Sequence, residues 1–411
     1  MRILHISNSD DGGAGLCCVR IHQSLLDMEV DSKVLVFHKT TDAHEVYGFG
    51  HKFGFFLYRI GSRLLDMIGI RLTARSKMIQ MSRQGKAVYT APVSPFDVTT
   101  HQLLEWADII HLHWINGFVD YPSFFEKVQK PVIWTLHDEN LFYGCAHFKK
   151  NLLTSHKYEM KYRRIKRAAV GDAHNLSIVF LSEMMRRTFG EELFIKDKRQ
   201  VVINNSIEVN AYSIYEKNKM RKKYNIDKDK TVLVFMAYDI MNEGKGLRML
   251  VDVLTKRSDS NRFVVLAIGG NPSNQPLPGM IKAVGLVKDH LTRNELMCCG
   301  DFFVMPSIQE AFAQSPMEAM ACGLPVLAFP VSGTEELIND ENGVICKEMT
   351  PQALNEGIDH ILKQNYRIEK IREYIMEYFS SSVMAGKYTS LYRTALTVGN
   401  MSSVEKAVRG G

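Results

Sequence analysis

The sequence predicts an α/β fold with two doubly wound units, and three observations support this prediction. Short apolar runs alternate with helix-like stretches from the first residues onward, and the runs resemble strands that are buried on both faces of a parallel sheet. After a polar, charged stretch in the middle of the chain, the same alternation starts again. A chain of 411 residues is also longer than one hydrophobic core usually organises.

The strand-like runs fix the expected domain boundaries. In the first half they cover residues 2–7, 33–38, 108–114, 131–137, 176–182 and 200–205. In the second half they cover residues 231–237, 262–270, 301–307, 325–331 and 343–346. We therefore expect a first domain over residues 1–205, a linker over 206–230 and a second domain over 231–378.

Composition excludes several classes of protein. Hydrophobic residues make up 45% of the chain and charged residues 23%, as in ordinary globular domains. No apolar run is long enough to span a membrane, and the N-terminus lacks the apolar region of a signal peptide. The seven cysteines contain no C-x-x-C pair. We expect a cytoplasmic protein with reduced thiols, without a metal, a bound cofactor or a nucleic-acid partner.

Two stretches of the first half are candidates for contact with an anionic membrane. Residues 149–167 carry eight Lys or Arg side chains against the single acid Glu159, which is typical either of a solvated helix face or of a surface that binds phosphate or anionic lipid. In residues 53–70, apolar side chains recur at helical spacing. Such an amphipathic helix packs on a core, lies on a bilayer surface or forms a lid over the acceptor.

The second half brings one cation and two carboxylates to the ends of strands. Glu310 follows an apolar strand, and ligands bind at the carboxyl ends of strands in open α/β sheets. Lys245 lies between two glycines ahead of a helix. Glu318 stands three residues after Ser315, so it is either a capping-box residue or a ligand-binding residue, and Gly323 is expected to end the helix. A lysine for a diphosphate and carboxylates for hydroxyl pairs suit a nucleotide sugar.

The first half offers weaker signals of the same kind. Gly12, Gly13 and Gly15 follow the first strand and precede a helix, whose N-terminus is suited to phosphate. His137 and Asp138 end a buried strand, and His111 and His113 alternate along another, where we expect polar strand-end residues rather than ligands. Asp227 and Asp229 have the D-x-D pattern of metal-dependent transferases, but their charged surroundings indicate a solvated turn.

Together these segments resemble the retaining glycosyltransferases of family 4, which have the GT-B architecture. The resemblance rests on "DDGGAGLCCVRIHQSL", "IIHLHWINGF", "PVIWTLHDENLFYGC" and "EGKG", and above all on "PSIQEAFAQSPMEAMACGLPVLAFPVSGTEELI", which is similar to the family's E-x7-E signature. It implies two Rossmann-like domains that face a cleft, with the acceptor on the first and the nucleotide sugar on the second. It also implies that a helix within residues 379–400 crosses back to the first domain.

The resemblance assigns roles to individual residues. It implies that Glu318 binds ribose and Glu310 the transferred sugar, with His137 near the reacting sugar and Lys245 at the diphosphate. The implied donor site also includes the segments Gly13, Ala14, Gly15 and Ala311, Phe312. The family's usual arginine before the lysine is missing, and Arg248 is the candidate substitute cation. The usual glycines around the first glutamate are Ala311 and Ala313.

The leading hypothesis is therefore a metal-independent hexosyltransferase that uses a nucleotide sugar, with UDP favoured, and a glycan or lipid-linked acceptor. The resemblance implies work in cell-surface polysaccharide biosynthesis, at the inner face of the plasma membrane if the two candidate stretches bind lipid. Two alternatives stay open. One is a catalytically weak or silent binding protein with the same fold, favoured by the missing arginine. The other is a sugar-nucleotide epimerase or a phosphorylase.

Overall fold

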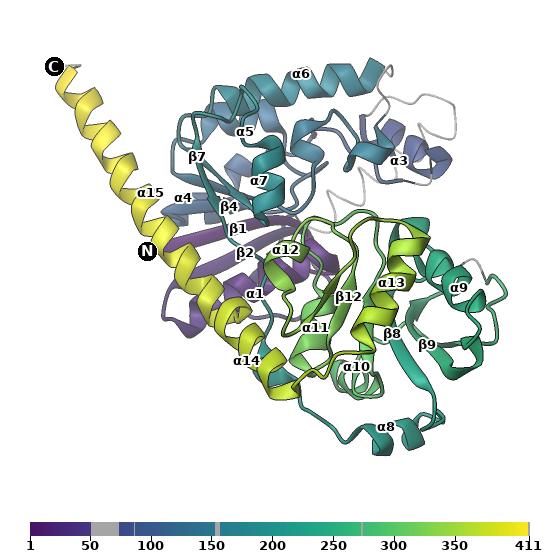
Figure 1. Cartoon of the computed structure of the whole chain (residues 1–411). Coiled ribbons are helices and arrows are strands. Elements are labelled where there is room, and N and C mark those ends of the chain that lie inside the picture. The colour runs from purple at the N-terminus through teal and green to yellow at the C-terminus, as the bar shows by residue number, and fades with distance from the viewer. Residues whose placement is uncertain (51–73, 86, 153–156, 273, 410–411) are drawn as a thin grey trace. The chain divides into compact units, whose positions relative to one another are not determined.

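The computed structural model describes residues 1–50, 74–85, 87–152, 157–272 and 274–409. The chain divides into two compact units (Figure 1). The first contains Met1–Ile203 and Met384–Gly411, and the second contains Asn204–Val383. Each unit is built on one parallel sheet, which confirms the predicted fold class.

The sheet of the first unit has seven strands in the order β3-β2-β1-β4-β5-β6-β7, and all neighbouring pairs are parallel. The strands are β1 (Arg2–Ser9), β2 (Asp31–His38), β3 (Val46–Gly48), β4 (Ile109–Leu112), β5 (Val132–Leu136), β6 (Leu176–Phe180) and β7 (Arg199–Val202). The chain order reverses between β1 and β4. This is the switch point of a doubly wound sheet, where ligand sites are usual.

Helices cover both faces of this sheet. They are α1 (Gly12–Asp27), α3 (Ala74–Gly85), α4 (Gln102–Trp106), α5 (Tyr121–Lys127), α6 (Lys157–Gly171), α7 (Glu183–Phe189) and α15 (Ser381–Arg409). One face packs Ile3, Ile109 and Ile133 against α1 and against Tyr388 and Tyr392 of α15. The last helix of the chain therefore completes the core of the first unit.

The sheet of the second unit has six strands in the order β10-β9-β8-β11-β12-β13, again all parallel. They are β8 (Thr231–Asp239), β9 (Phe263–Gly270), β10 (Ile281–Gly285), β11 (Phe302–Met305), β12 (Val326–Ala328) and β13 (Gly343–Ile345). Because β8 and β11 are neighbours at the switch point, the loops that follow them lie side by side.

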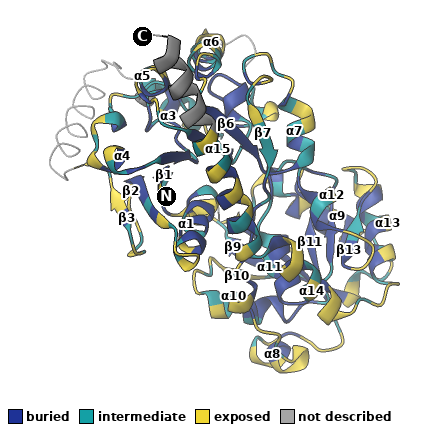
Figure 2. Cartoon of the chain, turned by 90° about the vertical axis from the view of Figure 1, so that its left-hand side faces the viewer, coloured by how far each residue is buried: buried dark blue, intermediate teal, exposed yellow. Residues whose placement is uncertain are grey.

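The helices of the second unit are α8 (Lys217–Lys223), α9 (Leu247–Thr255), α10 (His290–Met297), α11 (Ser315–Ala321), α12 (Thr334–Leu337), α13 (Pro351–Ile361) and α14 (Ile368–Phe379). Figure 2 shows buried strands and the exposed outer face of α8. Residues 206–230, expected to form a linker, belong to this unit. Arg221 on α8 is buried and bonds the Asp301 carboxylate at 2.7 Å, which fixes the segment to the sheet.

Two strands were not predicted from the sequence. β3 and β10 each lie at one edge of their sheet, and they are short and largely exposed, so they lack the continuous apolar run of an interior strand. The amphipathic stretch at residues 53–70 lies outside the described residues. Within the described part of the chain, no helix is both long and apolar enough to cross a membrane.

Candidate functional site

Lys245 and Glu310 form an ion pair at the carboxyl edge of the second sheet. Lys245 ends the 3₁₀ turn η5 (Glu243–Lys245) between β8 and α9, and Glu310 lies in the loop after β11. The Lys245 Nζ atom lies 2.6 Å from Glu310 Oε1, with the two side chains 36% and 14% exposed. The two predicted charges, 65 positions apart in sequence, therefore meet in one partly exposed site.

A glycine makes this meeting possible. Gly246 has φ +78°, and a Cβ atom there would lie 2.1 Å from the carbonyl oxygen of Pro306. The backbone amide of Ile308 also donates to the carbonyl of Gly244 at 3.0 Å. The turn that carries Lys245 is thus packed directly on the loop that carries Glu310, and a side chain at position 246 would separate them.

Glu318 lies on the neighbouring helix α11 and does not serve as its cap. The N-cap position is Gln314 without a side-chain cap bond, and Ser315 is already helical. The capping-box interpretation of Ser315 and Glu318 is wrong, because the helix begins one residue earlier than that pattern requires. The predicted end of the helix is confirmed, since Gly323 follows α11 with φ +80°.

The Glu318 carboxylate instead faces a cation that the sequence did not indicate. Arg293 Nε, on α10, lies 3.4 Å from Glu318 Oε2, and the Glu318 side chain is 13% exposed. Among the described residues neither of these two atoms has a hydrogen-bond partner. The Glu318 carboxylate is thus held by the charge of Arg293 rather than by a hydrogen bond between these two atoms.

The loop between Glu310 and Glu318 is fixed through its carbonyl groups. Ser332 Oγ donates to the carbonyl of Ala311 at 2.8 Å, and Asn205 Nδ2 donates to the carbonyl of Phe312 at 3.0 Å. Neither Ala311 nor Ala313 has a positive φ. Alanines in place of the family's usual glycines therefore impose no backbone strain on this loop.

Arg248, the candidate substitute cation, is exposed on α9. Its Nη2 atom donates to Gln275 Oε1, in the loop after β9. Asp227 and Asp229 are exposed, and the Asp227 side chain accepts from the Asp229 amide at 3.0 Å, which confirms the solvated turn.

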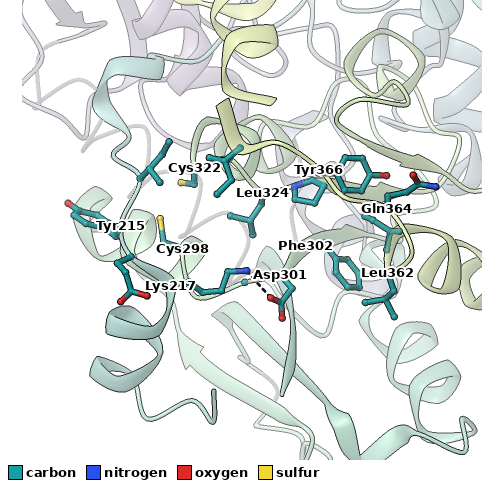
Figure 3. Close-up of a pocket in the computed structure, with 17 residues that line it drawn as sticks. Tyr215, Lys217, Cys298, Asp301, Phe302, Cys322, Leu324, Leu362, Gln364 and Tyr366 are labelled. Carbon is teal, nitrogen blue, oxygen red and sulfur yellow. Dashed lines mark hydrogen bonds and ion pairs between the residues drawn. The ribbon is translucent and has the colours of Figure 1, made fainter. Parts of the chain in front are cut away.

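A cavity of about 520 Å³ lies at the opposite edge of the second sheet (Figure 3). It is lined by Asp301 and Phe302 at the start of β11 and by Leu324 and Pro325 ahead of β12. Lys217 Nζ and Asp301 Oδ1 pair across its wall at 2.9 Å. Because these are the amino ends of the strands, the cavity is separate from Lys245, Glu310 and Glu318.

In the first unit, His137 and Asp138 follow β5 and line a small cavity with His113 and Trp114. Asp138 accepts from Trp114 Nε1 at 2.8 Å, and its Oδ2 lies 2.6 Å from His147 Nδ1. Burial alone would raise the pKa of Asp138, but its hydrogen bonds and the His147 ring hold that pKa below its ordinary value. Burial lowers the pKa of His137 to about 4, with Asp138 opposing the shift. His137 is therefore neutral at physiological pH.

The loop after His137 is held by charges from α6. Glu159 accepts from the amides of Gly144, Cys145 and Ala146, and both it and Lys166 are buried. Lys166 Nζ donates to the Asn140 carbonyl at 2.6 Å and to the Tyr143 carbonyl at 3.0 Å. The basic run 149–167 is thus not only a solvated face, because its one acid and one of its lysines are structural.

The glycine loop occupies the first turn of α1. Asp11 is the N-cap residue, and a Cβ atom at Gly15 would lie 2.6 Å from the carbonyl oxygen of Ser9, so only glycine lets the helix approach the strand. At Gly13 a Cβ atom would meet nothing within 4 Å. Gly13, Ala14 and Gly15 therefore lie where the N-terminus of a helix opens from β1, as predicted.

His111 and His113 share a face of the sheet, as predicted, and both are buried, with His113 directly after the end of β4. His111 bonds Tyr392 Oη at 2.7 Å and Thr135 Oγ1 at 2.8 Å. His113 bonds His137 at 3.1 Å. His5, Cys18 and His113 place ligand-type atoms within 4.8 Å of one another, a cluster that no spacing pattern in the sequence indicated.

Residues 216–378 match the family model of glycosyl transferases group 1. This segment of the second unit therefore has the sequence pattern of the group 1 glycosyltransferases. The chain is 25% identical over 289 residues to the "Putative teichuronic acid biosynthesis glycosyltransferase TuaC" of Bacillus subtilis, covering 69% of this chain and 68% of the relative. The chain is 26% identical over 274 residues to the N,N'-diacetylbacillosaminyl-diphospho-undecaprenol alpha-1,3-N-acetylgalactosaminyltransferase of Campylobacter jejuni, covering 61% of this chain and 67% of the relative.

A solved structure supports the GT-B fold of this chain. The crystal structure of HepE of Anabaena in complex with UDP-glucose superimposes with a TM-score of 0.65 at 17% identity, covering 96% of this chain and all of that one. At this identity the likeness concerns the fold. The matched family segment contains Lys245, Glu310 and Glu318.

Proposed function

We propose that this protein is a glycosyltransferase that retains the configuration of the sugar that it transfers, uses a nucleotide sugar with UDP as the favoured nucleotide, and acts on a hydroxyl group of a glycan or a lipid-linked acceptor. The observation that carries the proposal is the ion pair of Lys245 with Glu310 at the carboxyl edge of one sheet, with Glu318 on the helix that follows the Glu310 loop. The ligand class that this set of charges suits is a nucleoside diphosphate sugar. The cation matches the charge of its diphosphate, and the two carboxylates match the hydroxyl pairs of its ribose and its sugar.

Each of the three side chains has a distinct proposed role. Lys245 stabilises the charge that develops on the leaving diphosphate. Glu310 accepts hydrogen bonds from hydroxyl groups of the sugar, while its ion pair with Lys245 keeps both groups in place before the donor binds. Glu318 accepts from the ribose hydroxyl groups, and Arg293 behind it orients the carboxylate.

The proposed reaction breaks the bond between the anomeric carbon and the diphosphate oxygen and forms a bond from the same carbon to the acceptor oxygen. The acceptor attacks from the face that the diphosphate leaves, and its proton passes to the leaving diphosphate. Charge builds up on the diphosphate oxygens during this step. A preorganised cation at that position lowers the barrier without further rearrangement.

The first unit is proposed to bind the acceptor and to contribute His137. The neutral imidazole of His137 can form a hydrogen bond with a sugar hydroxyl without bringing a second charge to the reacting centre. Gly13 to Gly15 at the start of α1 are proposed to bind the phosphate side of the donor.

Three relatives support the choice of substrates. One is named for teichuronic acid biosynthesis, and another carries an undecaprenol-linked acceptor in its name. The HepE structure contains UDP-glucose. A polysaccharide or lipid-linked glycan as the acceptor class, and UDP as the nucleotide, are the choices that these names favour.

Calorimetry with a panel of UDP-, GDP- and ADP-sugars tests the proposal. We expect at least one UDP-sugar to bind wild-type protein and to bind Glu318→Gln more weakly. Glu216→Gln is the matched control, because Glu216 caps α8 outside the site. If folded protein binds no member of the panel, or if Glu216→Gln weakens binding as much as Glu318→Gln, the proposal fails.

A silent binding protein is the second candidate, and the missing arginine favours it, since Lys245 is the only Lys or Arg between Met236 and Gly246. Such a protein would bind the nucleotide without breaking the sugar bond. Release of free UDP, measured with a membrane lipid extract as the acceptor source, separates the two. Loss of that release in Glu310→Ala supports the enzyme, and equal release from Glu310→Ala and wild type contradicts it.

A further inference from the structure

Two buried imidazoles, His5 and His113, form a hydrogen-bonded row that ends at the partly buried ring of His137. His5 Nδ1 lies 2.9 Å from His113 Nε2, and His113 Nδ1 lies 3.1 Å from His137 Nε2. The rings come from β1, from the end of β4 and from the end of β5, which are consecutive strands of the sheet. His5 and His113 are 0% and 2% exposed, so the row runs from the interior of the unit to the loop of the candidate site.

A shared proton, rather than a metal ion, accounts for the spacing of these rings. Two nitrogens bound to one zinc ion at about 2.0 to 2.1 Å each would lie about 3.3 Å apart in tetrahedral geometry. The 2.9 Å between His5 Nδ1 and His113 Nε2 is the length of an N–H hydrogen bond. Both ring nitrogens of His113 are used in this way, one toward each neighbour.

The row couples the positions of the protons on its members. Burial lowers the pKa of all three rings, so each ring is neutral and carries one N–H group. A ring that accepts at one nitrogen must then donate at the other. Only two arrangements satisfy both bonds, with every N–H directed from His5 toward His137 or every N–H directed the opposite way.

The inner end of the row distinguishes the two arrangements. His5 Nε2 is buried and has no hydrogen-bond partner among the described residues. With the protons directed toward His137, this atom is a bare acceptor, and with the opposite direction it is an N–H without an acceptor, which is rare in folded proteins. Cys18 lies beside the row, and burial raises the pKa of its thiol, so that the thiol stays protonated. The Cys18 S–H can therefore donate a weak hydrogen bond, but it is not an anion that would attract the N–H of His5.

We propose that His5 and His113 are positioning residues that hold His137 in the tautomer with its proton on Nδ1. In this tautomer His137 accepts from His113 at Nε2 and presents a hydrogen-bond donor at its other nitrogen. The donor is suited to the oxygen of a sugar hydroxyl or of the leaving group. The role of this donor in transfer rests on the proposed function, but the tautomer itself does not depend on it.

Nitrogen-15 NMR of wild-type protein labelled in histidine tests the tautomer without any substrate. The His137 signals are identified by their loss in His137→Asn. We expect an N–H at Nδ1 and an unprotonated Nε2. A proton on Nε2 of His137 in the wild type overturns the proposal, whether or not transfer activity has been found. Stoichiometric zinc or copper in the purified protein overturns it too, because the ion would occupy the nitrogens of the row.

Variants of His113 test the consequence for turnover. His113→Leu removes the donor to His137, and we expect kcat to fall about tenfold, the equivalent of one lost hydrogen bond, with the KM for the donor sugar within twofold of wild type. His113→Asn can place its amide N–H where Nδ1–H stood and should recover most of kcat. The tautomer of His137 should change in the leucine variant and be kept in the asparagine variant.

His22→Leu is the matched control. His22 is as deeply buried and lies beside His5, but it bonds Ser32 and the carbonyl of His44 instead of the row. It should leave the His137 tautomer unchanged. If His22→Leu and His113→Leu reduce kcat equally, or if His113→Asn recovers nothing while folded, the histidines are structural and the proposal is wrong. If His113→Leu does not fold, the wild-type NMR spectrum still shows which tautomer His137 adopts, and His113→Asn still shows whether a donor at position 113 maintains it.

Discussion

Replacement of Lys245 by alanine should separate activity from stability. The Lys245 side chain is 36% exposed, and its one ion pair, with Glu310, is therefore screened by solvent. Exposed pairs of this kind contribute about 0.2 to 1 kcal/mol to the free energy of unfolding. In a domain of this size that corresponds to a melting temperature lower by less than about 4 °C.

The expected loss of activity is much larger. Lys245 is the cation proposed to face the leaving diphosphate, and removal of a preorganised charge-stabilising donor raises a barrier by about 2 to 4 kcal/mol. This is a fall in kcat/KM of roughly 30- to 900-fold. Initial rates of nucleotide release and thermal melting of the same samples measure both quantities.

Lys223→Ala is the control for the loss of one lysine ion pair in the same unit. Lys223 Nζ pairs with Glu295 at 2.5 Å, and its side chain is 52% exposed on α8, outside the proposed site. Lys223→Ala should have a melting temperature similar to that of Lys245→Ala and a rate of nucleotide release similar to that of wild type. A Lys245→Ala variant with a nearly normal rate, or with a loss of rate no greater than its unfolding explains, would refute the assignment.

Three further predictions follow from the same structure. Glu318→Gln should weaken donor binding in calorimetry with the melting temperature nearly constant, because α11 does not use this side chain as a cap; unfolding of the variant would contradict this. Burial lowers the pKa of Lys166 to about 7 from 10.5, so the unfolded chain binds more protons above pH 7 and stability should rise with pH. From pH 7 to 8.5, the free energy of unfolding measured with urea should rise by about 2 kcal/mol more in wild type than in Lys166→Met. If the free energies of the two proteins change in parallel with pH, the low pKa of Lys166 is refuted. Flotation with anionic vesicles should retain wild-type protein at low salt and lose it after charge reversal at Lys161 and Arg164, which are exposed on α6; protein that never floats excludes the membrane contact.

The interior strands were predictable because parallel strands with both faces covered must be apolar along their whole length. The edge strands β3 and β10 were missed because most of their residues are exposed or half-buried and need not be apolar, whereas the edge strands β7 and β13 overlap short apolar runs. The positions of Lys245 and Glu310 could be predicted from the strands that they follow. Their ion pair could not, because it depends on β8 and β11 being neighbours in the sheet.

Buried charge and long-range polar contacts were the main features that the sequence did not reveal. Glu159 and Lys166 lie within a run of basic residues, and charge spacing alone does not distinguish a solvated lysine from one that bonds three acceptors of a loop. The row of His5, His113 and His137 depends on the register of three strands. No spacing rule within one segment of sequence could have joined positions 5 and 113.

A crystal structure of the protein soaked with UDP-glucose tests the central claim most directly. The account predicts the diphosphate beside Lys245, the ribose hydroxyl groups on Glu318 and the sugar on Glu310, all at the carboxyl edge of the second sheet. A nucleotide in the cavity at the amino edge, lined by Asp301 and Leu324, with Lys245 and Glu318 free of ligand, would contradict it.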